Sequence, residues 1–318
     1  MKVVLASPIA DRAVEALRRD HDLVVAFGES GSLAGLISDR EVLIFRSGVG
    51  ISADLLKSAP HLQLAIRAGS GFDNIALDFC RDRGIRVARI PGPSSQAVAE
   101  FTLGLILSLS RRIAEAHDHM QQGEWPKHQL EGRLIAGKVL GVVGAGNIGK
   151  RVGELGALLG MRVVGCVEGP PEEHELVLAA KGITLTDFDT VVDQADILSV
   201  HVPLKDSTRH LIDSDVIHRM KPGSILVNTA RGGVVDESAV LDGLKSGHLG
   251  AVALDVHEQE GDGRLSPLAG LPNVVLTPHI GGMAAESQEM IGRRVIELID
   301  AFVHGRLEEV WTNDERLA

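Results

Sequence analysis

Three side chains with complementary acid–base properties each follow a short hydrophobic run in the second half of the sequence. Arg231 comes after SILVNTA, Glu260 after GAVALDV, and His279 after NVVLTP. An arginine can bind a carboxylate without losing its proton, and a histidine can exchange a proton near neutral pH. A glutamate beside the imidazole raises the histidine pKa and fixes the ring. Together these groups could move a proton to or from the oxygen of a bound 2-oxo or 2-hydroxy acid. Taken singly, each could instead be structural: a surface ion pair, a solvated loop charge and a hydrogen-bonded core histidine.

A glycine-rich turn lies upstream of these residues, where VVGAGNIGKRVG joins a hydrophobic run to a helical pattern. Gly144, Gly146 and Gly149 match G-x-G-x-x-G in the strand–turn–helix context that makes this motif meaningful. The first glycine permits a tight turn, the second lets the backbone approach a pyrophosphate, and the third lets helix and strand pack closely. Backbone amides at the helix start, those of Asn147 and Ile148 among them, would then face the phosphates.

The residue that ends the next hydrophobic run bears on the choice of dinucleotide. Glu168 closes RVVGCVE, and a carboxylate at this place binds a ribose 2′-hydroxyl and repels a 2′-phosphate. The segment EGPPEEHE that follows has no arginine or lysine before Lys181. We therefore predict NAD, and not NADP, as the cofactor. A solvated strand end is the alternative interpretation of Glu168.

The elements that position these residues alternate in type along the chain. Short β-branched runs are separated by amphipathic helical patterns with Gly and Pro at the switches, which is typical of parallel α/β folds. Five runs precede residue 91 and about six follow residue 137, the number in one dinucleotide-binding fold. Because the carboxyl ends of parallel strands share one edge of a sheet, Arg231, Glu260 and His279 should lie near the glycine turn. Between the two series, residues 94–122 predict one long, largely apolar helix, and a last helix is expected over 284–304.

Composition narrows the class of protein. The chain has 318 residues, a formal net charge of −11 and 44% hydrophobic residues, as expected for a globular protein without a nucleic-acid surface. Cys80 and Cys166 are its only cysteines, and no cluster has metal-ligand spacing, so we expect no metal and a reducing compartment. The start has no signal-peptide pattern and no run of 18 apolar residues occurs, which predicts a cytoplasmic protein that does not contact membranes.

The motifs, taken in order, resemble the D-isomer-specific 2-hydroxyacid dehydrogenases. The resemblance covers nearly the whole chain and rests on five segments: VLGVVGAGNIGKRVG, HVPLKDSTRHLI, MKPGSILVNTARGGVVDESAVL, GAVALDVHEQE and LPNVVLTPHIGG. It implies an NAD-dependent oxidoreductase acting on CH–OH donors in which Arg231, Glu260 and His279 are catalytic. It also implies further cofactor contacts: Asp255 with the nicotinamide carboxamide, Thr229, Ala230 and Gly282 at the same end, and Val202 near the adenosine. One departure is His257, at a position where relatives commonly have Phe or Tyr.

The same resemblance implies the architecture. A Rossmann dinucleotide-binding domain would be inserted into a flavodoxin-like parallel-sheet substrate domain. Residues 1–93 and 284–318 would form the substrate (catalytic) domain and residues 94–283 the NAD-binding domain, with hinge crossings near 94–100 and 283–290. Two sequential domains are the alternative. The apolar surface expected around residues 100–130 predicts a homodimer.

Two segments of the first domain bear on the substrate. RAGSGFDNI (67–75) resembles the family's substrate loop, in which the amides of Ser70 and Gly71 would bind a carboxylate. Arg46, in FRSGVGI, could bind a second anionic group such as phosphate, or could simply be solvated. These features most resemble D-3-phosphoglycerate dehydrogenases. Hydroxypyruvate or glyoxylate reduction, another 2-oxo acid, and an NAD-sensing corepressor-like binding role stay open as alternatives.

Overall fold

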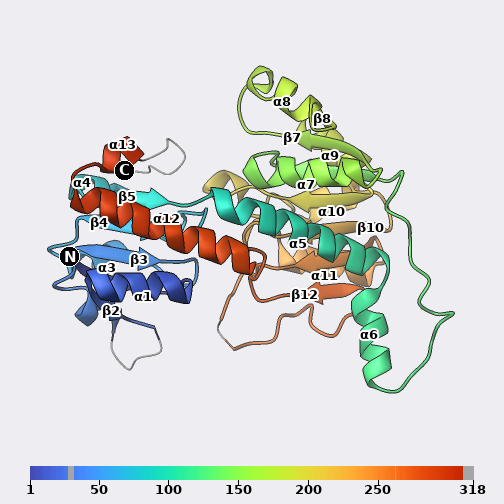
Figure 1. Cartoon of the computed structure of the whole chain (residues 1–318). Coiled ribbons are helices and arrows are strands. Elements are labelled where there is room, and N and C mark those ends of the chain that lie inside the picture. The colour runs from blue at the N-terminus through green and yellow to red at the C-terminus, as the bar shows by residue number, and fades with distance from the viewer. Residues whose placement is uncertain (28–31, 262, 311–318) are drawn as a thin grey trace. The chain divides into compact units, whose positions relative to one another are not determined.

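The computed structural model describes residues 1–27, 32–261 and 263–310 of the chain (Figure 1). The chain divides into two compact units. The first comprises Met1–Ser94 with Met283–Ala318, and the second comprises Ser95–Gly282. The boundaries expected from the sequence, 93/94 and 283/284, differ from these by one residue each. Both units are built on wholly parallel sheets, which confirms the predicted α/β class.

The first unit has a five-stranded sheet in the order β2-β1-β3-β4-β5, which is the flavodoxin-like order. All five strands were expected from the sequence. Their bounds are β1 (Lys2–Leu5), β2 (Asp22–Val25), β3 (Val42–Phe45), β4 (Leu64–Arg67) and β5 (Arg86–Arg89). The helices are α1 (Asp11–Asp20), α2 (Leu33–Leu36), α3 (Ala53–Lys57), α4 (Leu77–Asp82), α12 (Ala285–Val303) and α13 (Leu307–Val310).

Successive side chains along each strand of this sheet point to opposite faces, and both faces are apolar. Val3 and Leu5 pack with α1 and α12 on one face, whereas Val4 packs with residues of α3 and α4 on the other. Every residue of β3 is fully buried, as expected for a parallel strand covered on both sides. Where α1 meets α12, a Cβ on Gly292 would lie 2.9 Å from the Cβ of Ala13, so a side chain there would push the two helices apart.

The second unit has a seven-stranded sheet in the order β12-β11-β10-β9-β6-β7-β8. Counted within the unit, this is the Rossmann strand order with one further strand at the β12 edge. The strands are β6 (Val139–Val143), β7 (Arg162–Cys166), β8 (Ile183–Leu185), β9 (Ile197–Val200), β10 (Ser224–Asn228), β11 (Leu249–Leu254) and β12 (Val274–Leu276). The expectation of about six strands missed β8, because its three residues are too few to show an alternating pattern.

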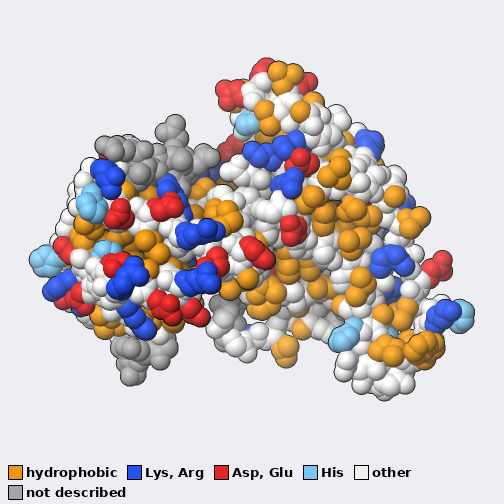
Figure 2. All heavy atoms as spheres, viewed as in Figure 1, with side chains coloured by type: hydrophobic (Ala, Val, Ile, Leu, Met, Phe, Trp, Pro, Cys, Tyr) orange, Lys and Arg blue, Asp and Glu red, His pale blue; other side chains and the backbone are white. Residues whose placement is uncertain are grey.

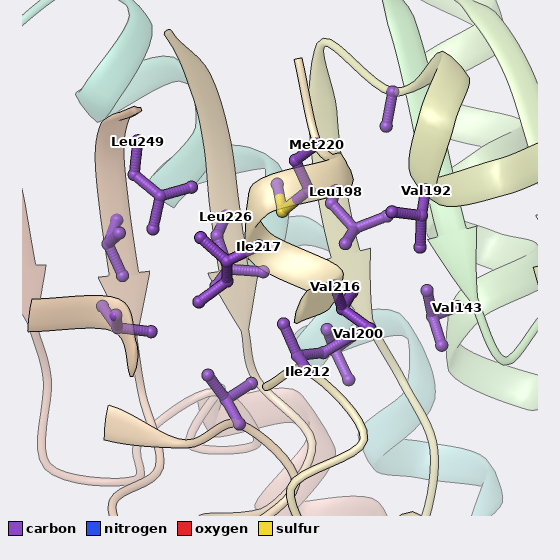
Figure 3. Packing of buried hydrophobic residues seen from close by; sticks show 14 of the residues in the cluster. Val143, Val192, Leu198, Val200, Ile212, Val216, Ile217, Met220, Leu226 and Leu249 are labelled. Carbon is purple, nitrogen blue, oxygen red and sulfur yellow. The ribbon is translucent and has the colours of Figure 1, made fainter. Parts of the chain in front are cut away.

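Helices cover both faces of this sheet. They are α5 (Gly92–Ser110), α6 (Ile113–Gln121), α7 (Asn147–Leu158), α8 (Glu175–Ala179), α9 (Phe188–Gln194), α10 (Ser214–Arg219) and α11 (Glu237–Lys245), with short 3₁₀ turns η1 (Pro171–Glu173) and η2 (Asp206–Thr208). Figure 3 shows one of the two cores, in which Ile217 of α10 and Met220, the residue directly after this helix, pack with Leu198 of β9 and Leu226 of β10.

The prediction of a single helix over residues 94–122 is wrong. The structure has two helices, α5 and α6, separated at Arg112, whose backbone is left-handed with φ 53°. The guanidinium of Arg112 binds Glu115, with Nε 2.7 Å from Oε2, and also donates to the carbonyl of Gln129. The returning loop satisfies the end of α5, because the Arg133 amide donates to the Ser110 carbonyl at 2.7 Å. Contacts distant in sequence therefore end α5 where no Gly or Pro marks the place.

None of the helices in the described part of the chain combines the length and apolar character needed to cross a bilayer.

Candidate active site

The glycine turn between β6 and α7 leaves no room for side chains at two of its three glycines. Gly144 has φ 91°, and a Cβ there would lie 2.7 Å from Cγ1 of Val202 and 2.8 Å from the His201 carbonyl oxygen. A Cβ on Gly149 would lie 2.1 Å from the Gly144 carbonyl oxygen. These glycines therefore allow β6, α7 and the loop after β9 to pack in direct contact.

The middle glycine of the turn has the opposite environment. A Cβ on Gly146 would meet nothing within 4 Å, and Gly146 directly precedes α7. The first amides of a helix, here those of Asn147 and Ile148, have no partner within the helix and carry its positive dipole end. Open space in front of free amides is what a pyrophosphate needs, so this turn fits NAD.

Glu168 and Val202 lie on the two sides of this turn. Val202 follows β9 and touches Gly144, as described above. Glu168 follows β7, its side chain is 76% exposed, and its Oε2 accepts a hydrogen bond from Nζ of Lys205 at 2.7 Å. The basic partner was missed in the sequence because it lies 37 positions further along the chain.

The loop after β10 carries Thr229, Ala230 and Arg231 and is held by buried hydrogen bonds. Asn228 is buried; its side chain accepts from the Ala230 amide at 3.0 Å and donates to the Arg231 carbonyl at 2.9 Å. The hydroxyl of Thr229 lies 2.9 Å from that of Thr102 on α5. Thr229 and Ala230 are both buried at the carboxyl edge of the sheet, and the backbone that carries Arg231 is fixed by Asn228.

Close backbone packing joins this loop to the loop after β11. A Cβ on Gly232 would lie only 1.8 Å from the His257 carbonyl oxygen and 2.8 Å from the Glu258 amide nitrogen. The glycine after Arg231 thus lets the segment carrying the arginine lie directly against the segment that leads to Glu260.

Asp255 organises the turn that carries His279. Its buried carboxylate accepts hydrogen bonds from the Thr277 hydroxyl at 2.7 Å, the Ile280 amide at 2.9 Å and the Gly281 amide at 2.8 Å. Within this turn His279 adopts a left-handed backbone, φ 55°, and its amide donates to the Asp255 carbonyl at 2.7 Å. Asp255 therefore fixes the direction of the histidine, a role that the motif alone did not indicate. Gly282 closes the same turn.

Glu260 and His279 form a hydrogen-bonded pair, with Nδ1 of the imidazole 2.9 Å from Oε2 of the carboxylate. A carboxylate oxygen accepts, so Nδ1 carries the proton and Nε2 is left to exchange one with a ligand. Burial acts to raise the pKa of Glu260, but the hydrogen bond from His279 and the nearby positive charge of the two histidines hold it below its usual range. The carboxylate is thus ionised at neutral pH.

His257 connects the two members of this pair. Its backbone amide donates to Oε1 of Glu260 at 3.2 Å, and its ring Nε2 donates to the Thr277 carbonyl at 3.0 Å. The sequence marks this residue only as a departure from the Phe or Tyr of relatives. In the structure it holds the Glu260 loop and the His279 turn at the same time.

In the first unit, the loops after β3 and β4 carry Arg46, Ser70 and Gly71. Asn74 ties the two loops together, because its side-chain amide donates to the carbonyls of Arg46 at 2.8 Å and Val49 at 2.6 Å. The Arg46 guanidinium donates to Gln288, and its burial lowers the pKa of Arg46 from the usual value. Ser70 is held through its hydroxyl, 2.8 Å from that of Ser94.

Comparison with known proteins identifies relatives of this chain. The family model for the D-isomer specific 2-hydroxyacid dehydrogenase, NAD binding domain, matches residues 103–281. The hydroxypyruvate reductase of Thermotoga maritima is 37% identical over 302 residues, covering 94% of this chain and 97% of that protein. The D-3-phosphoglycerate dehydrogenase of Methanocaldococcus jannaschii is 37% identical over 97% of this chain, which spans 59% of that relative. The structure of D-lactate dehydrogenase from Aquifex aeolicus with NAD and lactic acid superimposes with a TM-score of 0.88 at 30% identity, covering 99% of this chain and 98% of that one.

Proposed function

Because this chain belongs to the D-isomer-specific 2-hydroxyacid dehydrogenase family, we propose that His279, Glu260 and Arg231 interconvert a small D-2-hydroxy acid and its 2-oxo acid. NAD-dependent oxidoreduction of 2-hydroxy acids is the family's activity, and the glycine turn fits its cofactor. The observation that carries the assignment of roles is the Glu260–His279 pair on the same sheet edge as that turn. When bound, NAD supplies the nicotinamide ring that accepts or donates a hydride.

The protein groups divide the remaining work. Nε2 of His279 gives a proton to the substrate oxygen during reduction and takes it back during oxidation. Glu260 holds the proton on Nδ1 and stabilises the positive charge of the imidazolium while it exists. Arg231 binds the substrate carboxylate, since a guanidinium can do so in a bidentate manner and keeps its charge. Asp255 keeps the His279 turn in place, and we assign it, with Thr229, Ala230 and Gly282, to the nicotinamide end of the cofactor site.

The substrate that we favour carries a second anionic group, as D-3-phosphoglycerate does. Support comes from Arg46, a partly buried arginine whose loop Asn74 ties to the loop of Ser70 and Gly71. We assign the amides of Ser70 and Gly71 to the substrate carboxylate. Hydroxypyruvate or glyoxylate is the second candidate, because relatives of similar identity bear those names.

One panel assay tests both levels of this proposal. NADH oxidation is followed with phosphohydroxypyruvate, hydroxypyruvate, glyoxylate, pyruvate and longer 2-oxo acids. We expect turnover with at least one of them and the highest kcat/KM with phosphohydroxypyruvate. A preference for hydroxypyruvate or glyoxylate would refute the phosphate assignment and keep the reaction class. No turnover with any acid, despite NADH binding, would refute the enzymatic role and favour a binding function.

We further propose that the chain forms a homodimer through residues around 100–130 of the second unit. Large apolar side chains are exposed there, over α5, α6 and the loop after it (Figure 2): Leu107, Ile113, Met120 and Trp125 are 37%, 54%, 52% and 77% exposed. Exposed apolar groups gathered in one region are typical of protein interfaces. Sedimentation as a monomer at micromolar concentration would refute this. A cytoplasmic location stays a prediction from the sequence.

A further inference from the structure

The acidic residue of the adenosine end does not stand alone in the structure. Glu168 follows β7 and Lys205 follows β9, and the sheet order places β6 between these two strands. The Lys205 ammonium lies 2.7 Å from Oε2 of Glu168. The ion pair therefore joins residues from the two sides of β6, the strand that ends in the glycine turn.

The loop that carries Lys205 is well anchored. The Lys205 amide donates to the Thr208 hydroxyl at 2.8 Å, and that hydroxyl donates to the Pro203 carbonyl at 2.6 Å. Upstream, Val202 and the His201 carbonyl pack directly against Gly144. The backbone of the lysine thus has a fixed position beside the glycine turn, and only its flexible side chain remains to adjust.

This pair is poorly suited to stabilising the fold. The side chains are 45% and 76% exposed, and exposed ion pairs contribute little to the free energy of unfolding. The position of the pair, beside the glycine turn, is better suited to a role in selecting between NAD and NADP. A carboxylate there accepts from a ribose 2′-hydroxyl and repels a 2′-phosphate, whereas an adjacent ammonium attracts the phosphate and cancels part of that repulsion.

We propose that Lys205 is a second determinant of cofactor choice, which weakens the discrimination of Glu168 against the 2′-phosphate and would itself bind that phosphate if Glu168 were neutral. NAD remains the cofactor, because the carboxylate is in place. The inference rests on the placement of the adenosine ribose beside Glu168 in the proposed function, and it predicts measurable binding of the 2′-phosphorylated dinucleotide by the unaltered protein.

The test is a double-mutant cycle read by calorimetric binding of NADH and NADPH without substrate. Lys205→Met should weaken NADPH binding by about 5-fold and change NADH binding by less than about 2-fold. Glu168→Gln should tighten NADPH binding, and adding Lys205→Met should remove this gain. The effect of Lys205→Met on NADPH should therefore be larger in the Glu168→Gln background than in the unaltered protein, and it should shrink at high salt.

A matched control removes the same charge from the opposite edge of the sheet. Lys221 pairs with Asp196 at 3.0 Å, ahead of β10 and β9, and Lys221→Met should leave the NADH to NADPH ratio unchanged. If Lys205→Met altered both dinucleotides equally, or if the double variant bound NADPH as well as Glu168→Gln alone, the inference would be overturned while the proposed reaction stood. Failure of the unaltered protein to bind NADH would overturn both.

Discussion

The carboxyl edges of the two parallel sheets carry different kinds of polar group. In the second unit, the loops after β11 and β12 bring together two titratable side chains, Glu260 and His279. In the first unit, the loops after β3 and β4 present a guanidinium, Arg46, and the backbone of Ser70 and Gly71, none of which changes charge near neutral pH. In the function that we propose, the second unit handles the proton and the first unit binds an anionic group of the substrate.

The two edges also differ in how well they would accommodate a side chain in place of a glycine. Gly232 in the second unit approaches backbone, since its Cβ would lie 1.8 Å from the His257 carbonyl oxygen. Gly69 in the first unit approaches the end of a side chain, since its Cβ would lie 2.4 Å from Nη1 of the buried Arg67. Acid–base chemistry needs fixed distances, whereas an anion-binding loop can adjust by a side-chain movement.

The largest effect is expected where the proton is handled. His279→Ala should lower kcat by about 10³-fold, because no other group in the pair can exchange a proton with the substrate oxygen. The NADH dissociation constant should change little, since the glycine turn is untouched. Stopped-flow turnover and calorimetry measure the two quantities, and His218→Ala, on the exposed face of α10, is the control. A variant that kept most of its turnover would place the proton chemistry elsewhere.

The next effect separates anion binding from catalysis. Arg46→Ala should lower kcat/KM for phosphohydroxypyruvate by roughly 10- to 100-fold, the range for losing a charged hydrogen bond, and should affect glyoxylate much less. Arg18→Ala, an exposed arginine on α1, is the control. Equal losses on the two substrates would show that Arg46 does not bind a second anionic group.

Two glycine substitutions test whether the two sheet edges differ in how well they accommodate an added side chain. Gly232→Ala should lower kcat by about tenfold or more and the free energy of unfolding by about 1–3 kcal/mol, because two backbone segments must separate. Gly69→Ala should cost less in both, because its close neighbour is the end of a side chain, that of the buried Arg67, and not backbone. Urea unfolding and steady-state kinetics on both variants give the comparison. Equal costs would mean that the two edges are equally rigid.

Regular features of the chain were predictable from its sequence for a physical reason. All five strands of the first unit and six of seven in the second are apolar runs long enough to show a pattern, and the Rossmann and flavodoxin-like orders followed from the resemblance. The three glycines of the turn were expected to differ in their roles, and Gly146 does have open space where Gly144 and Gly149 have none. The catalytic roles of Arg231, Glu260 and His279 stay predictions.

Features that depend on contacts between distant residues were not predictable. The break between α5 and α6 relies on Arg112 reaching Gln129 and on Arg133 reaching back to Ser110, and no local signal marks it. Similarly, the three hydrogen bonds of Asp255 and the reach of Lys205 to Glu168 join residues more than 20 positions apart. Which side chains meet across two loops depends on the conformation of those loops, and the motifs did not indicate these contacts.

The smallest effect expected is a pH dependence confined to the second unit. The pKa of Glu260 is held below its usual range in the folded chain, although burial alone would raise it, because His279 donates a hydrogen bond to the carboxylate and adds positive charge. A carboxyl group with a lower pKa in the folded state stabilises the fold above its unfolded pKa, and this stabilisation is lost as the pH falls through the folded pKa. The difference in free energy of unfolding between the unaltered protein and Glu260→Gln should therefore be larger at pH 7 than at pH 4. It should stay below about 1 kcal/mol, since Glu260 is 38% exposed.

Arg46→Gln in the first unit should show no such trend, because the guanidinium stays charged throughout. Urea titrations at several pH values measure both, and a Glu260→Gln difference that stayed constant or grew toward acid would show that the pair is not held as an ionised carboxylate and an imidazole.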